Sequence, residues 1–141
     1  MNIKILSPDD DALHIDAIRL LNDGSVISLE RSAMLLAELT YVFIVALTDS
    51  GVIMGRIYGH VLHRYEQTDL LLYEVDVVEE HQRKGVGQAM MEFVKTLCVE
   101  RGYTEAWVLT EDENASARAL YSRAGGVVEA YPTVMYVFSH L

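Results

Sequence analysis

Three β-rich runs follow one another in the middle of the chain, and only short turns separate them. They span 41–48, 52–62 and 70–78, and residues 49–51, Asp-Ser-Gly, form the first turn. Parallel neighbours need a crossover connection of about a dozen residues or more, so these turns favour antiparallel pairing. The chain is therefore expected to build its sheet around an antiparallel meander.

Helical patterns lie on both sides of this meander. Val86, Met90, Phe93 and Leu97 repeat at helical spacing, and Gly102 ends the helix that they predict. The remaining expected elements are, in order, a strand at 2–6, helices from Ser7 to about Asn22 and from Ser28 to about Leu39, the helix at 85–101, a strand at 105–110, a helix at 114–124, and short strands at 126–130 and 133–138. The sequence therefore predicts an α/β fold in which a βαβ unit follows the meander.

Length and composition are those of one small domain. The chain has 141 residues, so residues 1–141 are expected to form a single domain. Lys and Arg number 11 and Asp and Glu number 21, and the net charge of −10 repels nucleic acid and anionic membranes but attracts cationic ligands. The single cysteine, Cys98, cannot form an intramolecular disulfide, so we expect a cytoplasmic protein without a signal peptide or a membrane span. The five histidines show no metal-ligand spacing, so no metal site is expected.

The strand predicted at 70–78 carries two carboxylates. Because strand side chains alternate, its two faces carry different residues. One face is expected to hold Leu72, Glu74 and Asp76, and the other Tyr73, Val75 and Val77. Paired carboxylates on one face suit proton transfer or the binding of a cation. The alternative is that both simply lie on the solvated face of a sheet.

A glycine-rich and basic segment joins this strand to the helix after it. Residues 82–87 read Gln-Arg-Lys-Gly-Val-Gly, which places unhindered backbone amides and two cations at the positive end of a helix. Such a loop suits a phosphate or diphosphate group, although an ordinary helix start with solvated Arg83 and Lys84 has the same composition. The segment is neither a Walker loop, which needs Gly-Lys-Ser/Thr, nor a dinucleotide fingerprint, which needs a small residue where Met90 stands.

Two motifs resemble signatures of the GCN5-related N-acetyltransferase (GNAT) superfamily. Residues 82–87 match its phosphate loop, Gln/Arg-x-x-Gly-x-Gly/Ala, and 114–121, Asn-Ala-Ser-Ala-Arg-Ala-Leu-Tyr, match its second signature. Both motifs stand in the family's order, and the expected elements follow the family's sequence over essentially the whole chain. The resemblance implies the GNAT fold, a central mixed and mostly antiparallel sheet that is flanked by helices and whose fourth and fifth strands splay apart.

This resemblance implies acetyl-coenzyme A (acetyl-CoA) as the donor. Its pantetheine arm would pair with the strand backbone at 75–77, and its diphosphate would bind the amides of the loop. Asn114 would hydrogen-bond the arm, although its position also suits a helix N-cap, and Tyr121 would lie near the coenzyme sulfur. The residues expected to bind acetyl-CoA are Val75, Asp76, Val77, Gln82, Arg83, Lys84, Gly85, Val86, Gly87, Gln88, Asn114 and Tyr121.

The expected chemistry is direct acetyl transfer to an amine through a tetrahedral intermediate. An amine is mostly protonated at neutral pH, so a base must take its proton before the nitrogen attacks the acetyl carbonyl. Glu74 is the candidate base, and Asp76 shares this task or attracts the ammonium group. Tyr121 is the candidate acid that protonates the departing thiolate, and the alternative is an aromatic packing residue. Cys98 is expected to be structural.

A further local resemblance concerns the acceptor. Residues 61–67, 72–75 and 80–83 are similar to the gentamicin-type aminoglycoside 3-N-acetyltransferases, in which an aspartate stands at the position of Glu74. This resemblance implies an aminoglycoside that is acetylated on its 3-amino group, and an acidic chain suits such a polycation. A peptide or protein amine and a polyamine are alternative acceptors, and a non-catalytic acetyl-CoA-binding sensor is a further alternative.

The C-terminal run from Val134 to Phe138 is apolar throughout. An exposed strand of this composition is a sticky edge, so we expect two copies of the chain to form a homodimer through it. The alternative is a final strand that packs inside the monomer.

Overall fold

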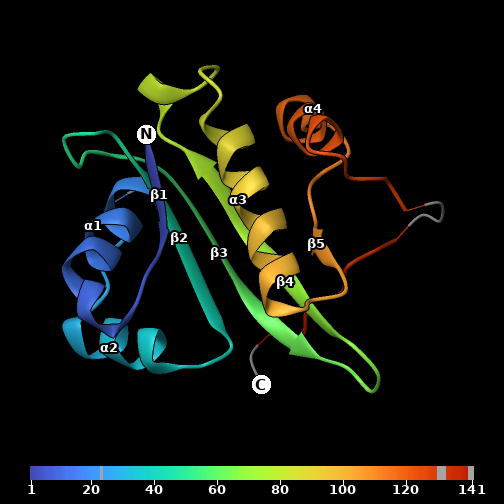
Figure 1. Ribbon diagram of the computed structural model, residues 1–141, viewed down its shortest axis with the longest axis horizontal. Coiled ribbons are helices and arrows are strands. Elements are labelled where there is room, and N and C mark those ends of the chain that lie inside the picture. The colour runs from blue at the N-terminus through green and yellow to red at the C-terminus, as the bar shows by residue number, and fades with distance from the viewer. Residues whose placement is uncertain (23, 130–132, 140–141) are drawn as a thin grey trace.

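The computed structural model describes residues 1–22, 24–129 and 133–139, and within them a five-stranded sheet forms the centre of the molecule (Figure 1). Its strands are β1 (Asn2–Ile5), β2 (Tyr41–Leu47), β3 (Ile53–His63), β4 (Thr68–Val77) and β5 (Ala106–Val108), and they lie side by side in that order. The first four pair antiparallel, while β5 is parallel to β4. The predicted mixed and mostly antiparallel sheet is therefore confirmed.

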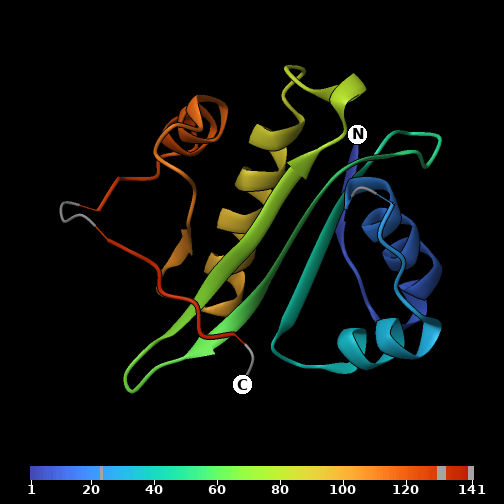
Figure 2. The same ribbon diagram turned by 180° about the vertical axis from the view of Figure 1, so that it is seen from behind.

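Helices cover both faces of this sheet. One face carries α1 (Asp11–Leu21), which the 3-10 turn η1 (Pro8–Asp10) precedes, and α2 (Leu29–Ala37). The other face carries α3 (Val86–Arg101), which follows the 3-10 turn η2 (Glu79–His81), and α4 (Ala115–Arg123). The views agree, since α3 lies in front of the sheet in Figure 1 and behind it in Figure 2. Each expected helix is present, and β4-α3-β5 forms the predicted βαβ unit.

Each face of the sheet has its own apolar core. Under α3, Val86, Met90 and Leu97 are buried, as the helical spacing predicted, and Phe93 is partly buried against the same core. On the opposite face, Phe43 and Val45 of β2 pack with Ala17 of α1. None of the described helices is long and apolar enough to cross a membrane.

A β-bulge interrupts the pairing of β3 with β4. Tyr58 faces Glu74, but the next residue of β3, Gly59, faces Leu72, so Tyr73 is an extra residue on β4. A side chain at Gly59 would place its Cβ 2.1 Å from a backbone carbonyl oxygen of β4. Only glycine allows the two backbones to approach this closely, so Gly59 makes the bulge possible.

The bulge changes which side chains of β4 share a face. Leu72 packs in the core under α3, whereas Glu74 and Asp76 lie on the opposite face, on the side of α1. Tyr73 turns toward Tyr58, and the centroids of their rings are 5.3 Å apart. The prediction that Leu72 shares the face of Glu74 while Tyr73 lies opposite is therefore wrong, because one inserted residue shifts the alternation.

The strands β4 and β5 pair over a short stretch and then separate. Their pairing ends at Leu72 and Val108, whereas β4 continues to Val77 without β5 beside it. The predicted splay of the fourth and fifth strands is confirmed. It leaves the backbone of β4 at 73–77 open toward the chain that follows β5.

The last two expected strands do not form in the described part of the chain. Residues 126–129 and 133–139 contain no strand, and Ala130 lies outside the described residues. The edge that they would have to join, β5, is only 3 residues long, and the side chains from Val134 to Phe138 are 73–80% exposed. The prediction of strands at 126–130 and 133–138 is therefore wrong for these residues, because a β-branched composition makes a strand only where another strand pairs with it.

Candidate active site

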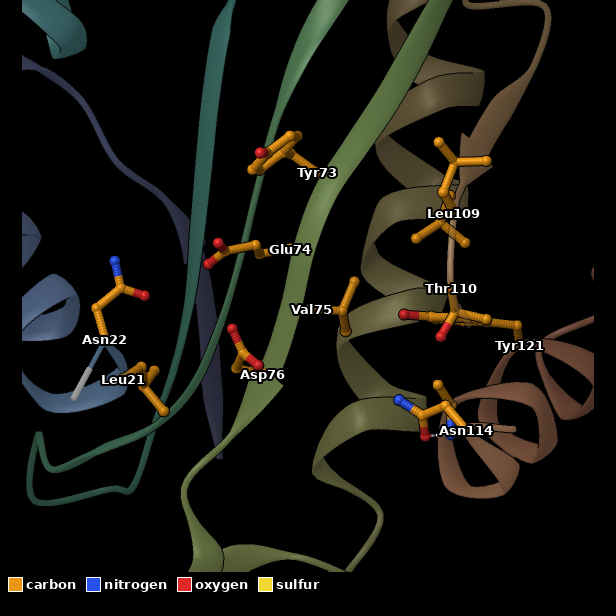
Figure 3. Close-up of a pocket in the computed structure, with 12 residues that line it drawn as sticks. Leu21, Asn22, Tyr73, Glu74, Val75, Asp76, Leu109, Thr110, Asn114 and Tyr121 are labelled. Carbon is orange, nitrogen blue, oxygen red and sulfur yellow. Dashed lines mark hydrogen bonds between the residues drawn. The ribbon is translucent and has the colours of Figure 1, made fainter. Parts of the chain in front are cut away.

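The splay between β4 and β5 opens a cavity of about 470 Å³ (Figure 3). It brings together five predicted site residues from distant parts of the sequence, which are Glu74, Val75 and Asp76 of β4, Asn114 at the N-cap of α4 and Tyr121 near the end of that helix. The C-terminal end of α1 closes the cavity on one side, and residues 108–110 close it on the other. The candidate base, acid and amide therefore face one space.

A buried arginine that sequence reasoning missed lies beside the two carboxylates. Arg56 of β3 is 1% exposed, and its Nη2 donates to Oδ2 of Asp76 at 3.0 Å, to Oδ1 of Asn22 at 2.7 Å and to Oε2 of Glu74. Antiparallel pairing places Arg56 directly opposite Asp76 in the sheet. The sequence does contain a signal for it, because an arginine within an apolar strand is costly to bury unless carboxylates pair with it.

The two carboxylates contact this buried guanidinium and also reach the cavity. Their side chains are 33% exposed for Glu74 and 43% exposed for Asp76. With both carboxylates ionised, the cluster of Arg56, Glu74 and Asp76 carries one net negative charge. It can therefore accept hydrogen bonds from an ammonium group and take up a proton from it.

Tyr121 lies across the splay from the carboxylates. Figure 3 shows its side chain extending from α4 toward β4 near Val75, whereas Glu74 and Asp76 point toward Asn22. Burial, and after it the negative charge of Asp76, raise the pKa of the Tyr121 hydroxyl above its usual value. The hydroxyl therefore stays protonated at neutral pH and can donate a proton to a group in the cavity.

Asn114 is the N-cap of α4. Its Oδ1 accepts a hydrogen bond from the backbone N–H of Ala117 at 3.1 Å, so the capping role that its sequence position suggested is present. This bond uses only the carbonyl oxygen of the side chain, and the amide nitrogen can still donate toward the cavity. Both expected roles of Asn114 are therefore compatible with the geometry.

The loop before α3 has the backbone of an anion-binding site. Arg83 and Gly85 both adopt the left-handed conformation, with φ of 59° and 84°, and the side chain of Gln82 anchors the loop by donating to the carbonyl oxygen of Val77 at 3.0 Å. The first backbone N–H of α3 that bonds within the helix is that of Ala89, so the N–H groups before it have no acceptor in the helix. The first turn of α3 also holds no acidic side chain that could accept hydrogen bonds from these N–H groups. Such a loop fits a diphosphate.

The two glycines of this loop are required for different reasons. Gly85 has open space around it and a positive φ, so its backbone conformation requires glycine. At Gly87 a Cβ would lie 3.1 Å from Cδ2 of Leu120 on α4. Gly87 therefore allows α4, which carries Tyr121, to approach α3, a packing role that the phosphate-loop motif did not predict.

Several residues of the cavity were not indicated by any motif. Leu21 and Asn22 line it because α1 ends beside β4, and Tyr73 lines it because the bulge turns its side chain to this face. These positions depend on how distant elements pack. The two glycines of β3, one of them at the bulge, are the local signal in the sequence for a departure from regular alternation.

The sequence as a whole decides the family. The sequence model of the acetyltransferase (GNAT) family matches residues 13–126. The chain belongs to the GNAT family of acetyltransferases. This GNAT protein is an acetyl-CoA-dependent N-acetyltransferase, as predicted. Comparison with curated proteins gives no match.

Solved structures of GNAT enzymes with different acceptors have the same fold. An aminoglycoside acetyltransferase from an uncultured soil metagenomic sample, in complex with sisomicin, matches with a TM-score of 0.87 and 23% identity over 97% of this chain and 95% of that chain. The aminoglycoside antibiotic 6′-N-acetyltransferase from Acinetobacter baumannii matches with a TM-score of 0.76 and 17% identity over 98% and 97% of the two chains. A ribosomal-protein-alanine N-acetyltransferase from Brucella melitensis biovar Abortus 2308 matches with a TM-score of 0.79 and 15% identity over 98% and 100%. At these identities the likeness shows the fold alone.

Proposed function

We propose that this GNAT enzyme acetylates an aminoglycoside, specifically on its 3-amino group. The observation that carries the proposal is a carboxylate pair with a net negative charge that lies across the splay from the hydroxyl of Tyr121. An aminoglycoside carries several ammonium groups, so it is attracted by this pair and by the chain's net charge of −10. The fold likeness to two aminoglycoside acetyltransferases supports this acceptor, and the local sequence similarity around Glu74 supports the 3-position.

The residues present fit acetyl-CoA, which supplies the acetyl group as a thioester. We assign its diphosphate to the amides and the two cations of the loop, and its pantetheine arm to the open backbone of β4 and to the amide nitrogen of Asn114. The backbone of β4 is available because β5 has already diverged at this point. The proposed binding residues are Val75, Asp76, Val77, Gln82, Arg83, Lys84, Gly85, Val86, Gly87, Gln88, Asn114 and Tyr121.

Two proton transfers by residues of the cavity complete the proposed reaction. A carboxylate oxygen of Glu74 takes a proton from the acceptor ammonium, directly or through one water molecule, which frees the nitrogen lone pair for attack on the acetyl carbonyl. Asp76 holds the ammonium group or shares its proton. The hydroxyl of Tyr121 then gives its proton to the departing thiolate, while the nitrogen of the new amide loses its second proton to water and solvent returns a proton to the Tyr121 oxygen. Cys98 takes no part as a nucleophile, because it is buried and its burial raises the pKa of its thiol.

A peptide or protein amine is the second candidate acceptor. The fold likeness to a ribosomal-protein-alanine N-acetyltransferase favours it. It would use the same carboxylates, because its amine is also protonated at neutral pH. A polyamine is a third candidate on the same chemical ground, so the acceptors must be separated by turnover.

A thiol-release assay with acetyl-CoA tests the proposal. Wild-type enzyme should release thiol with gentamicin-type and sisomicin-type aminoglycosides, and less with spermidine or an alanine-terminated peptide. Glu74→Gln should lower kcat by roughly 10²- to 10⁴-fold because it removes the base, while acetyl-CoA binding by calorimetry is unchanged. Tyr121→Phe should have a milder effect, because solvent also protonates a thiolate. Glu66→Gln, at an exposed glutamate of the β3–β4 turn, is the matched control and should match the wild type.

Each part of the proposal can fail separately. Turnover of the peptide or of spermidine, with none of the aminoglycosides, would replace the acceptor and leave the family unchanged. Full activity of Glu74→Gln would move the base elsewhere, with Asp76 next in line. Tight binding of acetyl-CoA with no thiol release for any amine would make the protein a sensor rather than an enzyme.

A further inference from the structure

We propose that Arg56 is a positioning residue for the acetyl transfer, which holds the carboxylates of Glu74 and Asp76 at fixed positions beside the cavity. The inference rests on the proposed roles of these two carboxylates. Arg56 itself lies beneath the cavity and does not line it. Its effect on the reaction would therefore pass through the groups that it binds.

The pairing of β3 with β4 builds this cluster. Arg56 stands opposite Asp76, and Tyr58, two residues along β3, stands opposite Glu74. The guanidinium carbon of Arg56 lies 5.4 Å from the centre of the Tyr58 ring, which holds the cation over that ring. The bulge follows immediately after Tyr58, so the two carboxylates lie on the last regularly paired residues before the strands slip by one.

A single nitrogen of Arg56 serves three acceptors. Its Nη2 donates to Glu74, to Asp76 and to Oδ1 of Asn22 at the end of α1, whereas its Nε is buried and has no hydrogen-bond partner among the residues that the structure describes. A buried donor without a partner costs stability, and an apolar residue of similar size often replaces a buried ion pair without loss. The hydrogen-bonding needs of the two carboxylates are therefore met better than those of Arg56.

The charge of Arg56 has a direct consequence for the pair. Two carboxylates that lie side by side on one strand repel each other, and a cation in contact with both reduces that repulsion. The guanidinium offsets one of the two charges, so one net negative charge faces the cavity. This charge matches one ammonium group of the acceptor.

The other titratable groups near Arg56 are neutral through the working pH range. Burial raises the pKa of Tyr58 to about 12, lowers the pKa of His14 to about 4 and raises the pKa of Tyr41 above its usual range. All three groups are therefore neutral between about pH 6 and pH 9. Among the described residues, the charged side chains that contact Arg56 are those of Glu74 and Asp76.

Two variants separate the charge of Arg56 from its geometry. Arg56→Gln removes both, so kcat should fall roughly 10- to 100-fold. Arg56→Lys keeps the charge but not the planar guanidinium group that contacts both carboxylates, so it should restore part of kcat and still fall roughly tenfold below the wild type. The acceptor KM should change less than kcat, because the positions of the carboxylates matter most in proton transfer.

Arg64→Gln is the matched control. Arg64 pairs with the buried Asp69 at 3.0 Å in the β3–β4 turn, outside the cavity, so this variant also removes an arginine from a buried carboxylate. It should lose stability without any change in kcat. Wild-type kcat in folded Arg56→Gln would overturn the proposal, as would a loss of stability alone, like that of Arg64→Gln. Should Arg56→Gln not fold, wild-type kcat in Arg56→Lys overturns it.

The same assay distinguishes this proposal from the proposed function. It is run with whichever amine the wild type acetylates fastest, so an unexpected acceptor leaves the test valid. Full activity in Glu74→Gln would remove the base and, with it, the reason for positioning that base. Loss of activity in Glu74→Gln together with wild-type kcat in Arg56→Gln would leave the proposed function intact and overturn only the role of Arg56.

Discussion

Gly85 and Gly87 stand two residues apart, yet substitutions at the two positions should have different effects. We expect Gly85→Ala to weaken acetyl-CoA binding roughly tenfold, because left-handed backbone costs a residue with a Cβ about 1–2 kcal/mol and the loop relaxes away from that conformation. We expect Gly87→Ala to lower the melting temperature instead, because its Cβ would lie 3.1 Å from Cδ2 of Leu120. Calorimetry with acetyl-CoA and thermal unfolding measure the two effects.

The double variant Gly87→Ala with Leu120→Ala provides the control. If the crowding of Leu120 is the cause, the alanine at 87 should cost less stability once Leu120 has been shortened. Equal losses of acetyl-CoA affinity in both glycine variants, without a change in melting temperature, would show that both glycines serve the ligand.

Arg56 shows why only part of the site was predictable. Glu74 and Asp76 could be placed on one face because they are two positions apart on one strand, and Asn114 and Tyr121 because they stand in a motif. The partner of the carboxylates depends instead on the register between β3 and β4, which no single strand contains. The bulge at Tyr73 then shifts the in-and-out alternation of side chains by one residue. The predicted faces are therefore right from Glu74 onward and wrong for Leu72 and Tyr73.

His14 connects three elements, α1, α2 and β2, on the side of the sheet that carries Glu74 and Asp76. Its Nδ1 lies 2.7 Å from the hydroxyl of Ser32 on α2, and its Nε2 lies 2.8 Å from the hydroxyl of Tyr41 on β2. The ring of His14 is fully buried and packs edge-on against Phe43, with the two ring centroids 4.6 Å apart. Burial, and after it the charge of Arg56, lower the pKa of His14 to about 4. Because α1 ends at the cavity, this contact also holds one wall of the site.

The stability of the protein should therefore depend on pH through His14. Its pKa in the folded state lies below the ordinary value of 6.5, so folding favours the neutral ring. This contribution is fully present above pH 6.5 and is lost as the pH falls from 6.5 to about 4, with a magnitude of about 3 kcal/mol. Urea unfolding at neutral pH and near pH 4.5 measures it.

A non-titrating variant isolates this group from the carboxylates. The difference in unfolding free energy between wild type and His14→Asn should shrink as the pH falls, because only the wild type loses the contribution of a neutral ring. Parallel pH curves for wild type and His14→Asn would contradict the assignment.

The fold from β1 to α4 was more predictable than the C-terminal part of the chain. Hydrophobic period and turn signals are local, so the helices and the meander could be placed from the sequence, and the two motifs fixed their order relative to the splay. Strand formation at 126–130 and 133–138 depends on a partner edge, and β5 offers one of only 3 residues. The composition of these two segments says nothing about the length of β5. Strands were therefore predicted in segments whose described residues form no strand.

The apolar run from Val134 to Phe138 remains 73–80% exposed, which is unusual for five consecutive large side chains. Removing apolar surface from water contributes about 25 cal/mol per Å², and no described element of the same chain covers these side chains. We predict that a second copy covers them, so that the protein is a homodimer in solution. In this arrangement the run would no longer be an exposed apolar surface that promotes aggregation.

Sedimentation velocity over a range of concentrations tests this prediction. Wild-type protein should shift with concentration from 15.9 kDa toward twice that mass. Tyr136→Glu should favour the monomer, because a carboxylate buried between two apolar segments loses its hydration without gaining a partner. Val99→Glu, at a valine of α3 that is 82% exposed outside this run, should dimerise like the wild type. A wild-type mass that stays at 15.9 kDa at every concentration would contradict the dimer, and equal weakening by both glutamates would place the contact elsewhere, because only one of them lies in the run.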